Sequence, residues 1–543
     1  MVQALAGGDP VPETLRSSGS VSVAVAISRV LGLVRMSLFS RLLGAGALAD
    51  SYSIAFRIPN LLRDLFAEGA LSSAFVPTFT AALVNEDKDA AFRLGNLVFS
   101  GLLIITGLLS TLGIVFAEQV VMTITDGWSP AKIARTAELT RVMMPILCLV
   151  SLGAVWMGML NAHRRYRRPA FAPAIFNIVS ILVGLGLWIS GVEGGQAVLV
   201  WSVGTLVAGI AQTLYQLPEL MRLGYRPRLR IRGLFRDPGV RRIVRLMLPA
   251  LVGVAAVQLN VFINTRFAAS LGDGPVAQIE YAFRVFFLPI GVFGVALATV
   301  TTTRVSEDAA RGDLEALTKR AGEGISAVWL LSSASAVGLF LLAEPVIRLL
   351  YEGGRFTPAD SAMVAQILQA YMIGLVPYSM VKVVAPTFYS LDRPRLPLLA
   401  SVTAVAVNLI FNALTYRSLG APGLALGTSL GALANIAILR VALARVVGAP
   451  NAEGRSRQLF HLVLANAVMG GAIVLAWWPV SLGLQWAREH TTGIEGGLLA
   501  VALLVIIFGG FVLYTAILRR FGFPGADLLA QLPSKLIRRL RRT

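Results

Sequence analysis

Charged residues and cysteines are scarce in this sequence of 543 residues. Only 14% of the residues are Asp, Glu, Lys or Arg, and 56% are hydrophobic, whereas soluble domains carry roughly a quarter charged residues. This composition excludes an ordinary soluble protein and indicates a polytopic membrane protein. The single cysteine, Cys148, excludes an intrachain disulfide and a cysteine-rich metal site.

Signatures of catalysis are absent as well. The three histidines, His163, His461 and His490, lie far apart in the sequence, and there is no Walker A motif or paired-aspartate motif. The net charge of +19 is a property of some nucleic-acid-binding proteins, but cytoplasmic loops of membrane proteins also collect Lys and Arg. We therefore predict a transporter, with no enzyme activity, no cofactor and no nucleic-acid partner.

The sequence is rich in apolar stretches, about fourteen of which are long enough to cross a bilayer as helices. Basic loops alternate with less charged ones, and the basic set includes residues 163–168, 221–245, 303–320 and 445–457. Basic loops mark the cytoplasmic side, which predicts that both termini are cytoplasmic. The first residues have no apolar core, so we expect a short extension rather than a secretory signal.

A weak internal repeat suggests two related halves. Ala55–Arg57 recurs as Ala282–Arg284, and Arg168-Pro169 recurs as Arg393-Pro394, both about 225 residues later. This offset corresponds to six helices, and an even number preserves orientation, which predicts parallel repeats. We expect an all-α fold of two six-helix lobes in a V, followed by two extra helices. The predicted parts are an extension (1–21), an N-lobe (22–220), a basic cytoplasmic linker (221–242), a C-lobe (243–446), helices 13 and 14 (447–518) and a basic cytoplasmic tail (519–543).

Seven basic side chains fall within the predicted spans. A charge in the hydrocarbon core costs at least about 2.5 kcal/mol, so such a side chain is expected to face protein, water or a substrate. Because the charges are mostly of one sign, they predict a path for an anionic substrate. They are Arg29, Arg35, Arg57, Arg63, Arg266, Arg284 and Lys382.

Polar residues in the first two predicted helices follow helical spacing. Arg29 and Arg35 flank Gly32 on one arc of the first helix, which predicts a shallow notch for a phosphate; pairing with a carboxylate is the alternative. In the second helix, a stripe typical of a cavity wall comprises Asp50, Arg57, Asn60, Asp64 and Glu68. Along this helix Arg57 could instead pair with Asp50 or Asp64.

Four segments carry a resemblance to a known family. They are SRVLGLVR (28–35), GAGALADSYSIAFRIPNLLRDLFAEGALSSAFVPTF (44–79), YAFRVFFLPIGVFGVAL (281–297) and VVAPTFYSLDRPR (383–395). Together they closely resemble the MurJ (MviN) family of lipid II flippases, within the multidrug/oligosaccharidyl-lipid/polysaccharide exporter superfamily. The resemblance implies fourteen helices around a central cavity in the inner membrane. It also implies outward flipping of undecaprenyl-pyrophosphate-linked peptidoglycan precursor for cell-wall synthesis.

The resemblance also implies site residues. The family's cavity arginines match Arg29, Arg35, Arg63 and Arg284, its helix-2 aspartate matches Asp50, and we add Asn60 of the polar stripe to this substrate site. Phe283 stands where some members have an acidic residue, which leaves a local partner for Arg284 open.

Some family members bind sodium, and the matching positions here have no carboxylate. They are Asn264, Asn408, Asn412 and Thr428, with the carbonyl of Leu424 as a further candidate. Arg266 would oppose a cation at Asn264 if it faced the same way. We therefore predict no metal site and no strong sodium coupling.

Other functions remain open at this point. A flippase for another polyprenyl-linked oligosaccharide would use the same scaffold. A multidrug or cation antiporter is disfavoured because buried cations repel cationic drugs, and an enzyme or receptor is more remote. The expected partners are lipid II and membrane lipids, with other cell-wall synthesis proteins as further candidates.

Overall fold

The computed structural model describes residues 11–66, 70–448, 455–490, 495–523 and 525–527. These residues are mostly helical and contain no β-strand, apart from an isolated bridge between Gly353 and Phe356. The all-α prediction is therefore confirmed. Ten helical segments in the described part are long and apolar enough to cross a membrane, and the count of fourteen stays a prediction.

The chain forms two compact units. Unit 1 comprises Met1–Ala277 and Gly353–Thr357, and unit 2 comprises Gln278–Glu352 and Pro358–Thr543. This division differs from the predicted lobe boundary at 221–242, because α11 (Pro238–Ala269) packs against α2 (Ala47–Phe66) and α3 (Ala70–Asn85) of unit 1. The boundaries of the repeat-based lobes stay a prediction.

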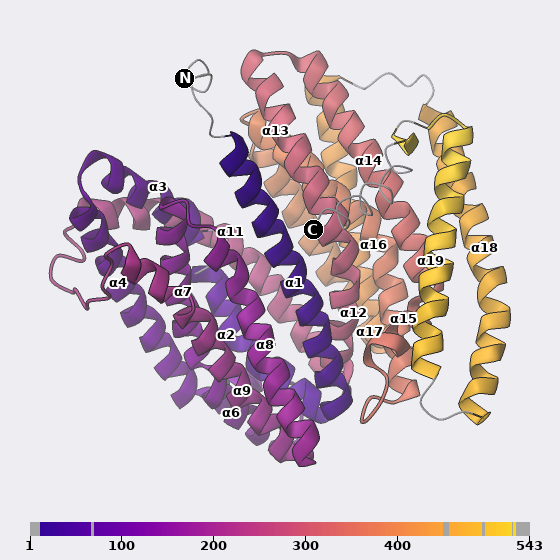
Figure 1. Cartoon of the computed structure of the whole chain (residues 1–543), viewed down its shortest axis with the longest axis horizontal. Helices are drawn as coiled ribbons and strands as arrows, with labels where there is room; N and C mark the ends of the chain where they lie inside the picture. The colour runs from indigo at the N-terminus through magenta and orange to yellow at the C-terminus, as the bar shows by residue number, and fades with distance from the viewer. Residues whose placement is uncertain (1–10, 67–69, 449–454, 491–494, 524, 528–543) are drawn as a thin grey trace. The chain divides into compact units, whose positions relative to one another are not determined.

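Unit 1 is a bundle of helices whose apolar core lies among α3, α4 and α7 (Figure 1). Its largest buried side chains include Phe75, Phe79 and Tyr225. A second layer is formed by α1, α8 and α9, which pack in that order. Besides α2, α3 and α11, the helices of unit 1 are α1 (Val11–Leu43), α4 (Lys88–Val115), α5 (Ala117–Ile124), α6 (Pro130–Met143), α7 (Pro145–Ala162), α8 (Arg167–Ser190), α9 (Gly194–Leu214) and α10 (Leu217–Arg222).

Unit 2 has two apolar clusters that share helix α14. One lies among α14, α16 and α17, and the other among α14, α18 and α19. The two predicted extra helices therefore correspond to α18 and α19 and pack on α14. The elements are α13 (Val295–Arg311), α14 (Leu314–Leu341), α15 (Ala343–Tyr351), α16 (Pro358–Ser390), α17 (Arg395–Val447), α18 (Arg455–His490) and α19 (Glu495–Arg520).

The helix α12 (Pro275–Pro289) begins in unit 1 and continues into unit 2. It is followed by a π-helical turn, η2 (Ile290–Gly294), and then by α13. Pro289 lacks a backbone N–H and so cannot complete the regular α-helical ladder, which explains an irregular turn at this place.

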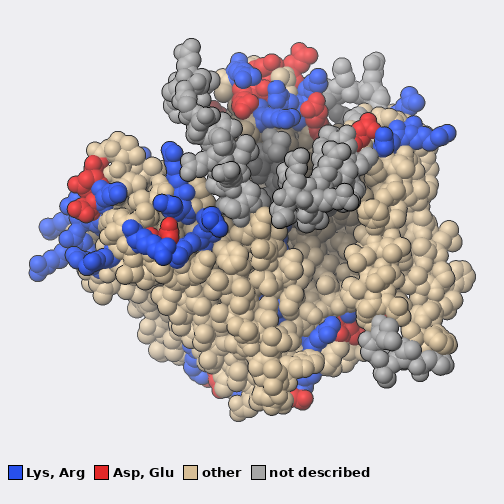
Figure 2. All heavy atoms as spheres, in the orientation of Figure 1, with Lys and Arg blue, Asp and Glu red and all other residues tan. Residues whose placement is uncertain are grey.

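The outer surface matches a membrane environment. The face of unit 1 formed by α8 and α9 is largely free of charge, and Lys and Arg gather near the ends of these helices (Figure 2). Large apolar side chains are exposed in the middle of the spans, such as Leu108 on α4 and Leu182 on α8. In a soluble protein so many exposed apolar residues would favour aggregation, whereas lipid tails solvate them.

One glycine divides the longest helix. Gly420 has φ 60° and ψ −149° and separates two helices within α17, at the point where the sequence predicts two spans. Only glycine adopts this backbone conformation without strain, because a Cβ atom would collide with the neighbouring backbone.

We predict that Gly420→Ala destabilises the protein by about 1–3 kcal/mol, the usual cost of such backbone strain. The measurement is thermal unfolding of the purified protein in detergent. Gly322→Ala in α14 is the matched control, because its Cβ atom would meet no neighbour and alanine favours helix over glycine by about 1 kcal/mol. Equal melting temperatures for the two variants would contradict the prediction.

Candidate functional site

The two arginines of α1 have different surroundings. Arg35 is 6% exposed, and its guanidinium lies 5.4 Å from the ring centre of Phe176 on α8. Arg29 is exposed, and its guanidinium has no ion-pair or hydrogen-bond partner among the described residues. Arg29 is therefore available to an anion, whereas Arg35 is packed on an aromatic face.

The notch predicted between these arginines is bordered by α8. The amide of Asn177 on α8 lies over Gly32, 3.6 Å from where a Cβ atom would stand, and donates to the carbonyl of Ser28 at 3.0 Å. Gly32 thus permits close packing of α1 on α8. Gly32 itself is half-buried, and the interpretation as a phosphate notch stays a prediction.

The cations of α2 are paired inside unit 1. Arg63 donates two hydrogen bonds to Asp64, and Asp64 also accepts from Gln258 of α11 at 3.1 Å. Arg57 donates to the hydroxyl of Thr265 on α11 at 2.7 Å. Neither alternative partner of Arg57, Asp50 or Asp64, is used. Asn60 lies half-buried on the same helix, and its Oδ1 has no hydrogen-bond partner in the described part of the chain.

Asp50 is fully buried near the start of α2 and holds the beginning of α12. Its carboxylate accepts hydrogen bonds from the backbone N–H groups of Gly274 at 2.6 Å and Ala277 at 2.9 Å. These N–H groups have no partner within the helix, so a carboxylate here satisfies them and favours the positive end of the helix dipole. The geometry makes Asp50 an N-terminal cap supplied by a different helix.

Lys132 completes this network, and sequence analysis missed it. Its ammonium group lies 3.2 Å from Asp50 and 2.6 Å from Asp273. It also lies 3.5 Å from the ring centre of Trp128, whose indole N–H donates to the carbonyl of Ala269. We call these residues (Asp50, Trp128, Lys132, Asp273 and Gly274) the Asp50 network.

The local sequence explains how Lys132 reaches Asp50. Ser129 caps α6, and Pro130 occupies the first turn, where a missing N–H costs nothing. This start places Lys132 in the first turn of α6, which packs against α2. The Trp-Ser-Pro sequence before Lys132 indicates a capped helix start with a lysine in its first turn. The partner, Asp50, could not be found in this way because it lies 82 residues away in the sequence.

In unit 2, Arg284 has the local partner that the sequence left open. Glu280, one turn earlier on α12, lies 3.3 Å from its guanidinium. The acidic partner of Arg284 thus stands four positions before it, whereas the resemblance led us to look for one at the position directly before. The Arg284 side chain remains 32% exposed, so part of its guanidinium stays accessible to a ligand.

Two further basic residues assigned to the spans are exposed. Arg266 lies near the end of α11, where its side chain is 51% exposed and pairs with Asp126 at 3.4 Å. It therefore lies near a helix end with an acidic partner, and its place relative to the bilayer stays a prediction. The ammonium of Lys382 on α16 lies 5.4 Å from the ring centre of Tyr378.

The degenerate sodium positions are divided between the units. Asn264 lies on α11 of unit 1 and donates to Asn260 at 3.1 Å. In unit 2, Asn408 and Asn412 are buried in α17, and the hydroxyl of Thr428 donates to the carbonyl of Leu424 at 3.2 Å. Two of the candidate sodium ligands, the Thr428 hydroxyl and the Leu424 carbonyl, are thus hydrogen-bonded to each other.

The predicted substrate residues are likewise divided. Arg29, Arg35, Asp50, Asn60 and Arg63 belong to unit 1, and Arg284 belongs to unit 2. Within unit 1, Asn60 and Arg63 share one helix, and Arg29 and Arg35 share another. The convergence of all four arginines on one diphosphate stays a prediction.

Comparisons with known proteins give this pattern a context. The sequence model described as "Lipid II flippase MurJ" matches residues 39–485. A relative from Rhizobium meliloti (strain 1021), named "Probable lipid II flippase MurJ", is 32% identical over 95% of both chains. The chain belongs to the MurJ family.

Two solved structures share the fold. The first is titled "Lipid II flippase MurJ, inward closed conformation"; it has a TM-score of 0.76 and 24% identity, and it covers 94% of this chain and 99% of its own. The second, an inward-facing multidrug resistance MATE family transporter of the MOP superfamily, has a TM-score of 0.66 and 17% identity, covering 79% of this chain and 98% of its own. The resemblance proposed from the four sequence segments is confirmed.

We predict that Lys132→Met lowers the stability of unit 1 by about 3–5 kcal/mol, because it leaves the buried carboxylate of Asp50 without its ammonium partner. Thermal unfolding in detergent is the measurement. Adding Asp50→Asn to Lys132→Met should restore part of the loss, since the remaining amide carries no charge.

The matched control for this prediction is Glu138→Gln, on the same helix. It removes an exposed pair with Arg135, which should cost no more than about 1 kcal/mol. A Lys132→Met variant as stable as this control would show that Asp50 does not depend on the lysine.

Proposed function

We propose that this chain moves lipid II, the undecaprenyl-pyrophosphate-linked peptidoglycan precursor, from the inner to the outer leaflet of the bacterial cytoplasmic membrane. Membership of the MurJ family across residues 39–485 carries the proposal. The multi-pass helical fold supports it, and the basic loops support an orientation with both termini in the cytoplasm. Other cell-wall synthesis proteins are candidate partners.

The arginines are assigned to the diphosphate of the substrate. Arginine binds phosphate oxygens through two parallel N–H donors, which a lysine cannot reproduce. Arg29 is the strongest candidate in unit 1, because it is exposed and has no partner among the described residues. Arg35, Arg63 and Arg284 are assigned to the same role, with Asn60 as a neutral hydrogen-bonding group beside them.

Asp50 is assigned to positioning instead of substrate contact. Its carboxylate is fully buried and already accepts from Gly274, Ala277 and Lys132. It caps α12, the helix that carries Arg284. We infer that Asp50 fixes the start of this helix and thereby the height at which Arg284 meets the substrate.

The driving force for this proposal is electrical. An anionic head group that moves outward across an inside-negative membrane gains about 2.3 kcal/mol per charge for each 100 mV. Alternating access of the two lobes would expose the head group first inside and then outside, while the prenyl tail stays in lipid. No ion site is needed for this cycle.

The first functional prediction concerns Arg29. Cells depleted of this protein should lose lipid II from the outer leaflet, and the wild-type gene should restore it. Arg29→Ala should fail to restore it at normal protein level, because the diphosphate loses a bidentate partner, and Arg29→Lys should restore it only in part. The measurement is leaflet-resolved lipid II accessibility.

Arg242→Ala serves as the matched control, since Arg242 is an exposed arginine at the start of α11. It should restore the wild-type level. Full function of Arg29→Ala would remove Arg29 from the site, and unchanged lipid II in depleted cells, with another polyprenyl-linked glycan retained inside, would redirect the whole proposal.

The second functional prediction concerns energy coupling. Because Asn264, Asn408 and Asn412 replace carboxylates, we expect transport in vesicles to respond to membrane potential and to change less than about twofold when potassium replaces sodium. The measurement is lipid II flipping at a potential that is clamped to the same value in both salts. A steep sodium dependence would show that neutral oxygen atoms suffice for coupling.

A further inference from the structure

The connection between α10 and α11 is held along the side of α4 by its backbone. The N–H of Arg228 donates to Oδ1 of Asn96 at 3.0 Å, and the N–H of Arg230 donates to the hydroxyl of Ser100 at 2.8 Å. Asn96 in turn donates to the carbonyl of Arg226 at 3.2 Å. Two residues of extended chain rise by about 6.6 Å and four residues of helix by about 6 Å, so this register matches an extended segment along the helix.

Two buried side chains anchor the ends of this segment on α4. The ring of Tyr225 is fully buried, 5.5 Å from the ring of Phe92. Leu234 is also buried and packs on Gly101, where a Cβ atom would stand 3.2 Å from its Cδ1. The segment therefore follows the side of α4 from Phe92 to Gly101. We call residues 225–236 the strap.

The strap exposes two kinds of side chain in alternation. Successive side chains of an extended segment point to opposite sides, which separates the arginines at even positions from the apolar residues between them. Leu229 is 70% exposed, Ile231 60% and Phe235 83%. The exposed arginines are Arg226, Arg228, Arg230 and Arg232.

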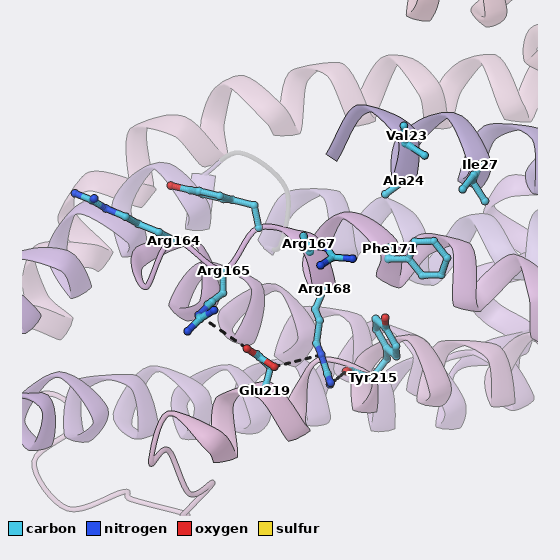
Figure 3. A pocket seen from close by; sticks show the side chains of 11 residues that line it. Val23, Ala24, Ile27, Arg164, Arg165, Arg167, Arg168, Phe171, Tyr215 and Glu219 are labelled. Atoms are coloured by element: carbon cyan, nitrogen blue, oxygen red, sulfur yellow. Dashed lines mark hydrogen bonds and ion pairs between the residues drawn. The ribbon is translucent and has the colours of Figure 1, made fainter. Parts of the chain in front are cut away.

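No carboxylate balances these arginines. Their guanidinium groups have no ion-pair or hydrogen-bond partner in the part of the chain that the structure describes. Asp237, the acidic residue that follows the strap, caps the start of α11 through the N–H groups of Gly239 and Val240. The α7–α8 connection differs, because Arg165 and Arg168 both reach Glu219 there, at 3.9 and 3.5 Å (Figure 3).

The apolar side chains of the strap continue the apolar surface of α4. Ile105 and Leu108 lie four and seven positions after Gly101, on the same face of the helix, and are 47% and 59% exposed. Helix α4 is long and apolar enough to cross a membrane. A basic cytoplasmic loop accounts for the arginines alone, whereas large exposed apolar residues beside such a helix indicate contact with lipid.

We propose that the strap binds the anionic lipid surface of the cytoplasmic leaflet. Its arginines would lie at the lipid phosphates, and Leu229, Ile231 and Phe235 would enter the boundary between head groups and acyl chains. Basic and apolar residues together bind such surfaces, through charge attraction and apolar burial. An acidic protein would also attract the arginines, but the continuity with the exposed face of α4 favours lipid.

The test measures which lipids contact the strap in the full-length protein. A bimane fluorophore is attached to Phe235→Cys in a Cys148→Ala background, and the protein is placed in nanodiscs of equal parts phosphatidylglycerol and phosphatidylcholine. Bromine atoms on the acyl chains of one lipid or the other quench the fluorophore on contact. The ratio of the two quenching constants gives the local preference for the anionic lipid.

The charge variant combines Arg228→Gln with Arg230→Gln, which leaves the backbone bonds to α4 in place. The control combines Arg165→Gln with Arg222→Gln, two exposed arginines beside Glu219. It removes the same charge from a nearby part of unit 1.

Both brominated lipids should quench the wild-type fluorophore. Phosphatidylglycerol should be preferred by at least about fivefold, since one basic residue near an anionic surface contributes this much. The charge variant should lower the preference by at least about the same factor, and the control should leave it within about twofold. If the charge variant does not fold, Arg232→Gln alone should lower the preference by more than about twofold.

Two results would overturn the proposal. One is the absence of quenching by either lipid, which would place Phe235 in water and leave the strap to an acidic protein. The other is equal quenching by the two lipids, or a preference for phosphatidylglycerol that the charge variant leaves unchanged. Neither result depends on whether the protein flips lipid II.

Discussion

The cost of an uncompensated charge inside a membrane governs the arrangement of this protein. A cation in the bilayer core must be paired, packed on an aromatic face or exposed to water. Unit 1 uses different solutions at different places. Arg63 has Asp64, Arg57 has the hydroxyl of Thr265, and Arg35 has the ring of Phe176. Because two of these partners sit on other helices, satisfying the charges also fixes how α1, α2, α8 and α11 pack.

The Asp50 network follows from the same constraint and connects it to the path of the chain. A buried carboxylate is as costly as a buried cation, and Asp50 is compensated by two backbone N–H groups and one ammonium. The N–H groups belong to the start of α12, which continues from unit 1 into unit 2. A charge buried near the start of α2 thus holds the beginning of the helix that continues into unit 2. Loss of the Asp50 carboxylate would leave the N–H groups at the start of α12 and the ammonium of Lys132 without this acceptor.

Sequence patterns predicted the elements far better than their partners. Apolar length and basic loops were enough for the all-helical membrane fold, because every backbone group in lipid must be satisfied within a helix. The division of α17 at Gly420 coincided with a break between predicted spans. By contrast, Thr265, Asn177 and Lys132 could not be identified as partners, because each lies on another helix and its contact depends on how the helices pack. Glu280 was within reach of the sequence, since one helical turn separates it from Arg284.

Pairing also decides which cations can act on a ligand. An arginine next to a carboxylate contributes little net field beyond a few ångströms, because the two charges oppose each other. Arg63 beside Asp64 therefore attracts a distant anion weakly and can bind one only at close range. Arg29, which has no such neighbour among the described residues, keeps its full field. In the proposed function, an anion that approaches unit 1 is drawn first toward Arg29. The paired residues then contribute hydrogen bonds once the anion is close, so the proposal assigns attraction and recognition to different arginines of the same bundle.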